Sequence, residues 1–271
     1  MKKFLSLLLA GLIVLGLVAC GGSSTSKVED SANKNLVDET TSTEASTSEK
    51  DSKQVLVMCT NAEFPPYEYK DNNEFKGIDV EISQLIAKKL NVEVKIEDIA
   101  FDSLLPEVNS GKADFAMAGM TVTEDRMENV DFTHTYQTAV QVVVVNADSS
   151  ITDVDGLTGK TVGVQLGTTG DIYCSGSESG LNVERYNKII DGFQAMKAGK
   201  VDACVIDDQV AKNIVSTDPT SYKILETKYA EEEYAIAVKK GNTELLNKLN
   251  TIIDEIKENG ELKAIIDKYI K

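Results

Sequence analysis

Residues 116–126 read AMAGMTVTEDR, a short apolar run followed by groups that can bind a small zwitterion. If a strand ends before Gly119, the carbonyl of Gly119 and the amides after it need bonding partners outside the sheet. Thr121 adds a hydroxyl that both donates and accepts, and Arg126 adds a planar fork that matches a carboxylate. The chain has only one other arginine and otherwise uses lysine for positive charge. The alternative interpretation is a turn in which Thr123 caps a short helix and the arginine is solvated.

The N-terminus has the pattern of a bacterial secretion signal. Two lysines precede an apolar run at residues 4–17, which is too short to span a bilayer comfortably. The run ends in Leu-Val-Ala-Cys, which resembles a bacterial lipobox, in which the cysteine is lipidated and becomes the mature N-terminus. The alternative is an ordinary signal peptide. We therefore expect a signal peptide at residues 1–19 and a lipid on Cys20 that anchors an extracytoplasmic protein to the outer face of the bacterial cell membrane.

Residues 20–53 are expected to form a disordered tether. They are mostly Ser, Thr, Glu, Asp and Lys, and a segment with so few large apolar side chains cannot bury a core. As a flexible coil the tether would span roughly 30 Å. That length would hold a domain off the surface of the membrane.

Charge and composition exclude several classes of partner. The 271 residues include 44 acidic and 28 basic side chains, which give a formal net charge of −16. Such a surface makes nucleic acid and anionic lipid poor partners. A metal or other cofactor is not expected, because the chain has one histidine and its cysteines show no ligand-like spacing. Whether two of Cys59, Cys174 and Cys204 form a disulfide is left open.

The residues after the tether alternate between predicted strands and helices. In the first half, strands are expected at residues 55–60, 92–96 and 114–118. Asp79 is expected to cap the first intervening helix, and residues 101–106 to open the second. This order predicts a doubly wound α/β sheet, in which ligands gather at the carboxyl ends of the strands. Those ends carry Asn61, Phe101 and the segment after Gly119.

The second half repeats this layout without obvious sequence repetition. A long strand at residues 137–145 carries the chain away from the first sheet. The pattern then restarts, with strands expected at residues 160–165, 183–186 and 202–206. A glycine-rich turn at residues 166–170 leads into a helix whose free amides are suited to an anion. A strand at residues 233–238 returns, and two helices at residues 243–257 and 261–270 close the chain.

Several motifs resemble those of bacterial amino-acid-binding lipoproteins that serve ABC importers, the solute-binding proteins of the glutamine- and histidine-binding kind. The motifs are GIDVE at 77–81, FDSLLP at 101–106, GKAD at 111–114, TVTEDR at 121–126, DFT at 131–133, GTT at 167–169 and DACVID at 202–207. The resemblance covers residues 54–271 and the lipobox. It implies a free L-amino acid as ligand, ABC permease and ATPase subunits as partners, and a monomer without a cofactor or a catalytic residue.

The resemblance also implies a fold. Two doubly wound α/β lobes would be joined by a two-segment hinge, as in type II periplasmic binding proteins. Lobe 1 would contain residues 54–138 and 234–271, and lobe 2 residues 139–233. The two crossing segments are expected near residues 136–140 and 231–235.

Roles for individual residues follow from the same resemblance. Arg126 would clamp the ligand carboxylate with help from the amides of Thr121 and Thr169. Asp207 would take the α-ammonium together with the Gly119 carbonyl and the Thr121 hydroxyl, although it could also cap the helix that follows it. The full set of expected ligand-binding residues is Asn61, Phe64, Phe101, Gly119, Met120, Thr121, Arg126, Gln165, Thr169 and Asp207.

The expected side-chain pocket departs from that of glutamine binders. Asn61, Gln165 and Ile206 stand where those proteins have aspartate, lysine and histidine. These departures argue against a glutamine binder. The two amides suit a polar or cationic ligand side chain between the aromatic walls Phe64 and Phe101. Whether Glu63 faces the same pocket is left open.

Two interpretations from other functional classes compete with transport. The first is an enzyme on the same fold, similar to dehydratases that act on prephenate or arogenate, for which Glu63 is the one acid or base that can be placed. The second is a sensory or adhesive domain that works without a transporter. Asp79 and Asp102 match family motifs but are expected to cap helices rather than to contact ligand.

Overall fold

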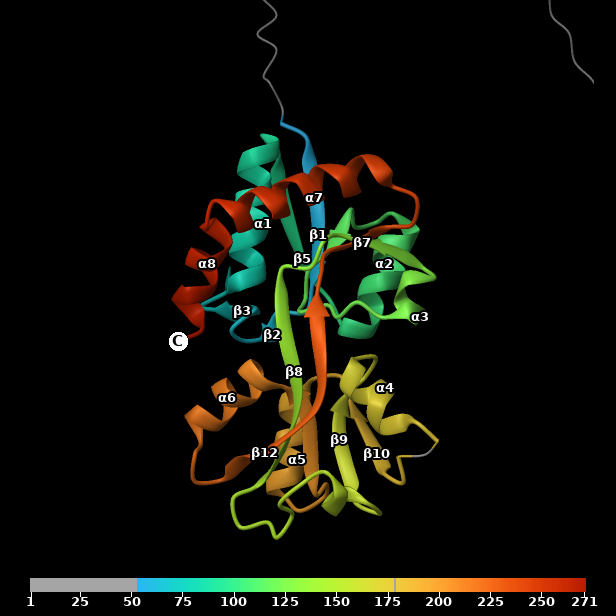
Figure 1. The fold of residues 1–271 in the computed structure, drawn as a ribbon, viewed down its shortest axis with the longest axis vertical. Helices are drawn as coiled ribbons and strands as arrows, with labels where there is room; N and C mark the ends of the chain where they lie inside the picture. Colours follow the sequence, from blue (N-terminus) through green and yellow to red (C-terminus); the bar gives the residue numbers. More distant parts are fainter. Residues whose placement is uncertain (1–52, 178) are drawn as a thin grey trace, which may run out of the picture. The chain divides into compact units, whose positions relative to one another are not determined.

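The computed structural model describes residues 53–177 and 179–271, so the predicted signal peptide, Cys20 and nearly all of the tether lie outside the described residues. The described residues form two lobes, each built on a five-stranded mixed sheet (Figure 1). The two-lobe α/β fold class predicted from the sequence is confirmed. None of the described helices is long and apolar enough to cross a bilayer.

Lobe 1 contains the sheet with the strand order β5-β1-β6-β13-β7. β1 (Val55–Thr60) pairs in parallel with β5 (Glu93–Asp98) on one side and with β6 (Phe115–Ala116) on the other. β13 (Ala237–Lys239) pairs antiparallel with both β6 and β7 (Val130–Phe132). The C-terminal part of the chain therefore completes the sheet that the N-terminal part begins.

Lobe 2 contains the sheet with the strand order β10-β9-β11-β8-β12. β9 (Thr161–Gln165) pairs in parallel with β10 (Asn182–Tyr186) and with β11 (Ala203–Asp207). β8 (Gln137–Asn146) pairs antiparallel with β11 and is buried along residues 142–145, a run of valines. Such β-branched side chains fit the two-sided burial of a central strand.

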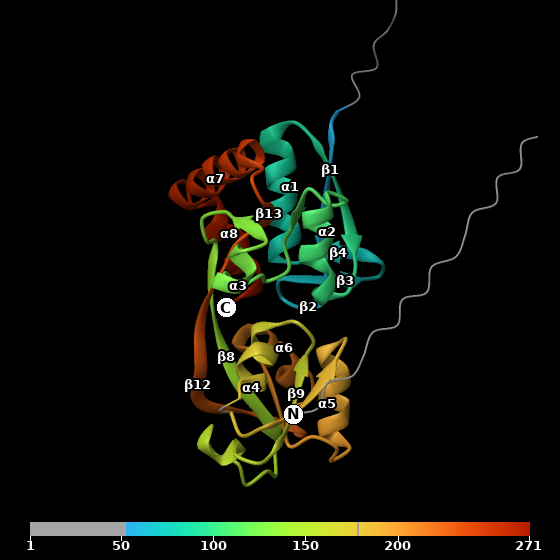
Figure 2. The ribbon, with the colours of Figure 1, turned by 90° about the vertical axis from the view of Figure 1, so that its right-hand side faces the viewer.

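β8 and β12 (Tyr222–Tyr234) form the connection between the lobes (Figures 1 and 2). They pair antiparallel, with Gln137 opposite Tyr234 and Val140 opposite Glu231. The two crossing segments predicted from the sequence therefore lie side by side. A connection of two strands has the form of a hinge, about which domains close around ligands in other proteins.

The helices pack against these sheets. Their bounds are α1 (Ile78–Leu90), α2 (Leu104–Ser110), α3 (Glu124–Met127), α7 (Thr243–Glu258) and α8 (Glu261–Tyr269) in lobe 1, and α4 (Thr169–Ser175), α5 (Ile189–Lys197) and α6 (Asp208–Thr217) in lobe 2; short 3₁₀ turns occupy Phe101–Ser103 and Asp155–Leu157. α1 and α7 contribute the fully buried side chains Ile82, Ile86, Leu249 and Ile253 to the core of lobe 1. All three cysteines in the described part of the chain are buried thiols without a disulfide.

Two predicted strands differ clearly from the observed ones, and β7, most of β12 and one small sheet were not predicted. The third strand ends at Ala116 rather than at residue 118, and the chain then turns at Gly119, whose φ is 52°. The expected strand at 233–238 is divided between β12 and β13, because the chain changes sheets there. β2 (Glu63–Phe64), β3 (Glu68–Asp71) and β4 (Glu74–Lys76) form an additional three-stranded sheet. Its turn signal is Asn72-Asn73, both with positive φ, as the type I′ turn of a two-residue hairpin requires.

The expected cap at Asp79 was wrong. Gly77 occupies the N-cap of α1, and Asp79 is a fully buried residue in the first turn. Its carboxylate accepts hydrogen bonds from the Gly119 amide at 2.9 Å and from the Tyr136 hydroxyl at 2.8 Å. Burial raises the pKa of Asp79 to about 6. The side chain thus fixes the turn at Gly119 to the helix and to the start of the first crossing segment.

Asp79→Ala should lower the free energy of unfolding by about 1–3 kcal/mol, because the amide of Gly119 and the hydroxyl of Tyr136 would both remain buried without an acceptor. Urea unfolding followed by circular dichroism measures this change. Tyr136→Phe is the matched control, since it removes one donor and leaves the carboxylate in place, and it should lose less stability. Equal stabilities for Asp79→Ala and the unchanged protein would contradict this role.

Candidate functional site

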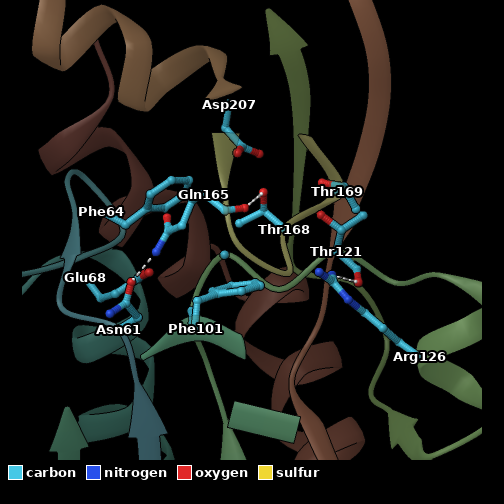
Figure 3. A pocket seen from close by; sticks show the side chains of 12 residues that line it. Asn61, Phe64, Glu68, Phe101, Thr121, Arg126, Gln165, Thr168, Thr169 and Asp207 are labelled. Carbon is cyan, nitrogen blue, oxygen red and sulfur yellow. Dashed lines mark hydrogen bonds between the residues drawn. The ribbon is translucent and has the colours of Figure 1, made fainter. Parts of the chain in front are cut away.

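A pocket lies where the two lobes meet, at the carboxyl ends of β1, β9 and β11 (Figure 3). It is lined by Asn61, Phe64, Glu68, Phe101, Ala118, Gly119, Thr121, Arg126, Gln165, Thr168, Thr169 and Asp207. Every residue expected to bind ligand is in this set except Met120. The space that these side chains leave has a volume of about 10 Å³, which is about the room that one water molecule needs.

Arg126 is the one basic side chain in this pocket, and it is 7% exposed. Its Nη1 donates to the Thr121 carbonyl at 2.6 Å, and its Nη2 donates across the lobes to the Gly167 carbonyl at 3.1 Å. The guanidinium carbon lies 5.5 Å from the centre of the Phe101 ring. No described carboxylate approaches within the 4.0 Å of an ion pair. Burial lowers the pKa of Arg126, so the side chain is a desolvated cation with donors to spare.

The structure at Arg126 contains one of the two elements of the alternative drawn from the sequence. Thr123 does cap α3, because its side chain accepts a hydrogen bond from the Arg126 amide at 3.2 Å. The arginine side chain, however, is buried against the pocket instead of solvated. The cap therefore sets the backbone from which the guanidinium reaches back to the Thr121 carbonyl.

Asp207 enters the pocket from the opposite lobe, at the end of β11 (Figure 3). It occupies the N-cap position of α6, but its side chain makes no capping hydrogen bond. Instead its Oδ1 accepts a hydrogen bond from the Tyr234 hydroxyl. Burial, and then the nearby charge of Glu232, raise the pKa of Asp207 to about 7. A cation placed beside this carboxylate would lower that pKa again.

The end of the pocket away from Arg126 is polar (Figure 3). Gln165 from lobe 2 donates to the Asn61 Oδ1 of lobe 1 at 2.8 Å, and Asn61 in turn donates to the Ile99 carbonyl. Glu68 lies beside them and is 1% exposed, and its Oε2 has no hydrogen-bond partner among the described residues. Burial, and then the charge of Asp79, raise the pKa of Glu68 well above its ordinary value.

Aromatic rings form the walls of the pocket. Phe64 and Phe101 both line it, and Phe64 stacks on the buried Tyr67. Gly119 lies against the Phe64 wall, because a Cβ built on it would be 3.1 Å from a carbon of that ring. The pocket therefore combines two apolar faces, a cationic end and an end with a carboxyl group and two amides.

Two side chains, those of Met120 and Asp102, lie elsewhere than expected, and the structure places Glu63, whose orientation was left open. Met120 is buried in the core of lobe 1 and does not line the pocket. Glu63 lies outside the set of pocket residues and forms an ion pair with Lys188 of the other lobe. Asp102 caps no helix and lies within the 3₁₀ turn, where Gly167 packs against it.

Glu68, Ala118 and Thr168 line the pocket and were not singled out from the sequence. Thr168 accepts a hydrogen bond from the Asp171 amide and so caps α4, and Ser/Thr before a helix is a signal that could have identified it. Glu68 begins β3 of the small sheet, so recognising the Asn72-Asn73 hairpin would have shown which face it occupies.

Residues 56–271 match the family described as bacterial extracellular solute-binding proteins, family 3. This chain belongs to that family. The family predicted from the sequence is therefore confirmed. The solute-binding protein is 34% identical to the arginine-binding extracellular protein ArtP of Bacillus subtilis (strain 168) over 99% of this chain and 98% of ArtP.

Solved structures show the same fold. An ancestral arginine-binding protein bound to arginine is 39% identical, with a TM-score of 0.76, over 81% of the solute-binding protein and 100% of that chain. An ancestral amino-acid-binding protein called a precursor of cyclohexadienyl dehydratase is 29% identical, with a TM-score of 0.74, over 80% of this chain and 96% of that one. Both alignments span nearly the whole of the relative.

Gly167→Ala should hold the lobes apart. Gly167 has a φ of 79°, and its added Cβ would be 3.1 Å from the Asp102 Cβ in the other lobe. Small-angle X-ray scattering should show a larger radius of gyration for this variant. Gly159→Ala is the matched control, because Gly159 has a φ of 75° but nothing within 4 Å of the added atom. It shares the backbone strain without the contact between lobes, so equal radii in the two variants would contradict the prediction.

Proposed function

We propose that this solute-binding protein captures a free L-amino acid with a cationic side chain, arginine above all, and delivers it to an ABC permease and its ATPase. The observation that carries the proposal is the pair of opposite charges in one pocket. Arg126, a buried cation without an ion-pair partner among the described residues, comes from lobe 1, and the buried carboxyl of Asp207 comes from lobe 2.

The binding site for the ligand carboxylate follows from the incomplete hydrogen bonding of Arg126. A buried guanidinium with only two hydrogen-bonded donors is poorly compensated, and a bidentate carboxylate compensates both its charge and its remaining donors. Thr169 begins α4, so its amide belongs to the first turn of that helix, where amides lack partners within the helix. We assign the ligand carboxylate to Arg126 with the amides of Thr121 and Thr169.

The ammonium end follows from Asp207. Its carboxylate would pair with the α-ammonium of the ligand, and the Gly119 carbonyl and the Thr121 hydroxyl supply further acceptors. Because the two charged groups come from different lobes, both ends of a zwitterion are satisfied only when the lobes are closed. The ligand would therefore favour the closed state.

The opposite end of the pocket suits a guanidinium or an ammonium. Phe64 and Phe101 offer faces for cation–π contacts, each worth about 0.5–2 kcal/mol. Glu68 brings a carboxyl group with an unpartnered oxygen, and Asn61 and Gln165 bring amides. The arginine named in the descriptions of two relatives supports this choice of ligand.

A thermal-shift screen over the twenty L-amino acids and cystine tests this choice of ligand, because a ligand that binds the folded state raises the melting temperature.

Entry of the ligand requires the lobes to open. A volume of about 10 Å³ cannot hold an amino acid, and β8 with β12 is the connection about which the lobes would move. We also propose that residues 1–19 are a signal peptide and that Cys20 carries a lipid. With the tether at residues 20–53, this lipid would hold a monomer at the outer face of the membrane.

Binding without turnover is part of the proposal. A dehydratase precursor is among the relatives in structure, but the relatives themselves are described as binding proteins. A catalytic function would need an acid or base aimed at the substrate, and Glu63, the candidate from the sequence, is paired with Lys188. Incubation with amino acids, prephenate and arogenate tests this, since any product would contradict the assignment.

Arg126→Lys, as well as Arg126→Ala, should weaken binding of L-arginine by about 2–5 kcal/mol, because each change removes the fork that pairs with a buried carboxylate. Isothermal titration calorimetry measures the loss. The matched control is Arg185→Lys, which alters the other arginine at its ion pair with Asp171, outside the pocket. Unchanged affinity in Arg126→Ala would defeat the assignment.

Affinity for L-arginine should fall as the pH is lowered from 8 to 6. The pKa of Asp207 is about 7 without ligand, so below that pH the carboxyl is protonated and must lose its proton before it pairs with an ammonium. The expected loss approaches about tenfold per pH unit well below the pKa. Calorimetry at several pH values measures it, and Asp207→Asn should bind weakly with a flatter pH profile. A wild-type affinity independent of pH would contradict the role of Asp207.

A further inference from the structure

Glu232 is a buried acid beside the pocket that the sequence motifs do not mark. It lies on β12, in the second crossing segment, opposite Ala139 of β8. It is 5% exposed, whereas its neighbours Glu231 and Glu233 are exposed, as the alternation of a strand requires. The inference drawn from it rests on the proposed function and concerns how the site recognises the α-amino group of its ligand.

The carboxylate of Glu232 holds two side chains next to the pocket. The Thr121 hydroxyl donates to Glu232 Oε2 at 2.9 Å, and Gln141 Nε2 donates to the same oxygen at 3.1 Å. Gln141 Nε2 also lies 3.4 Å from Thr169 Oγ1. Thr121 and Thr169 both line the pocket. Glu232 is therefore connected by hydrogen bonds to pocket residues from both lobes.

The bond to Glu232 decides what the Thr121 hydroxyl can offer a ligand. A hydroxyl has one proton and two lone pairs. Because its proton is given to Glu232, the oxygen of Thr121 is left as an acceptor only. An acceptor at this place suits the ammonium group of an amino acid and gives nothing to a ligand that has no donor there.

The chain itself brings Glu232 to this position. The Val122 amide donates to the Glu233 carbonyl at 3.0 Å, and the Ala235 amide donates to the Met120 carbonyl at 3.1 Å. Thr121 lies between these two bonds and forms a bridge with Tyr234. The segment that carries Thr121 is thus paired with the crossing strand just beyond Glu232.

Charge supports the same role. Glu232 is the strongest of the charges that offset the burial of Arg126, and it is also the charge that adds to the raised pKa of Asp207. Glu232 forms no ion pair with Arg126, so the remaining donors of the guanidinium stay available to a ligand carboxylate. Glu232 Oε1 has no hydrogen-bond partner among the described residues. The carboxyl group of Glu232 therefore keeps one unused acceptor oxygen beside the pocket.

We propose that Glu232 is a positioning residue for the α-ammonium subsite, which fixes Thr121 as an acceptor and so makes the pocket select L-amino acids over analogues that lack the α-amino group. The selectivity would come from the crossing strand, outside the ligand's contact surface. A purely structural role in the connection between the lobes would instead weaken all ligands alike.

The test compares L-arginine with 5-guanidinopentanoic acid, which has the same carboxylate and guanidinium but no α-amino group. Calorimetry gives the ratio of the two dissociation constants for the full chain and for Glu232→Gln. In the variant, the preference for L-arginine should shrink by about tenfold or more, the loss expected for a hydrogen bond to a charged group. Circular dichroism and melting without ligand show that the variant is folded.

Two further variants sharpen the result. Glu233→Gln changes the neighbouring exposed acid on the same strand and should leave the ratio as in the unchanged protein. In a Thr121→Val background, Glu232→Gln should change the ratio little further, because the hydroxyl through which it acts is absent. An equal loss of affinity for both ligands in Glu232→Gln would overturn this inference. Failure of the unchanged protein to bind L-arginine would overturn the proposed function itself, so the two failures are distinguishable.

Discussion

The buried guanidinium of Arg126 is the feature on which the rest of the site depends. Removing a cation from water is unfavourable unless other groups compensate for it, and here two backbone carbonyls do so only in part. One of those carbonyls, that of Gly167, belongs to the other lobe. The pocket is therefore arranged around a charge that the protein itself leaves incompletely paired, which is the condition for strong recognition of a carboxylate.

The other charges of the site come from parts of the chain that are far apart in sequence. Asp207 ends a strand of lobe 2, Glu232 lies on the crossing strand, and Glu68 begins a hairpin of lobe 1. All three are buried, and burial raises the pKa of both Asp207 and Glu68. A ligand with more positive than negative charge, as proposed above, would lower these pKa values and favour the ionised forms of the acids.

Family motifs located the pocket well because they mark backbone geometry. The TVTEDR segment, the GTT turn and the end of DACVID all border the pocket, as their positions after strands predicted. Prediction was weaker where a side chain's neighbours are distant in sequence. Met120 shares a loop with pocket residues but turns to the core, and Glu63, whose orientation the sequence left open, turns to Lys188. Asp79 matched a capping position by spacing, yet its hydrogen bonds go to residues 40 and 57 positions away.

The sequence by itself determined the family, the two-lobe α/β class and most of the residues that border the pocket, because strand periodicity and short motifs are local properties. The tertiary structure alone decided which polar groups are buried together. The pairing of Thr121 with Glu232, of Asn61 with Gln165 and of Gly167 with Arg126 joins segments separated by 41 to 111 positions. Such pairs depend on how two sheets and two crossing strands pack, and no local pattern encodes that arrangement.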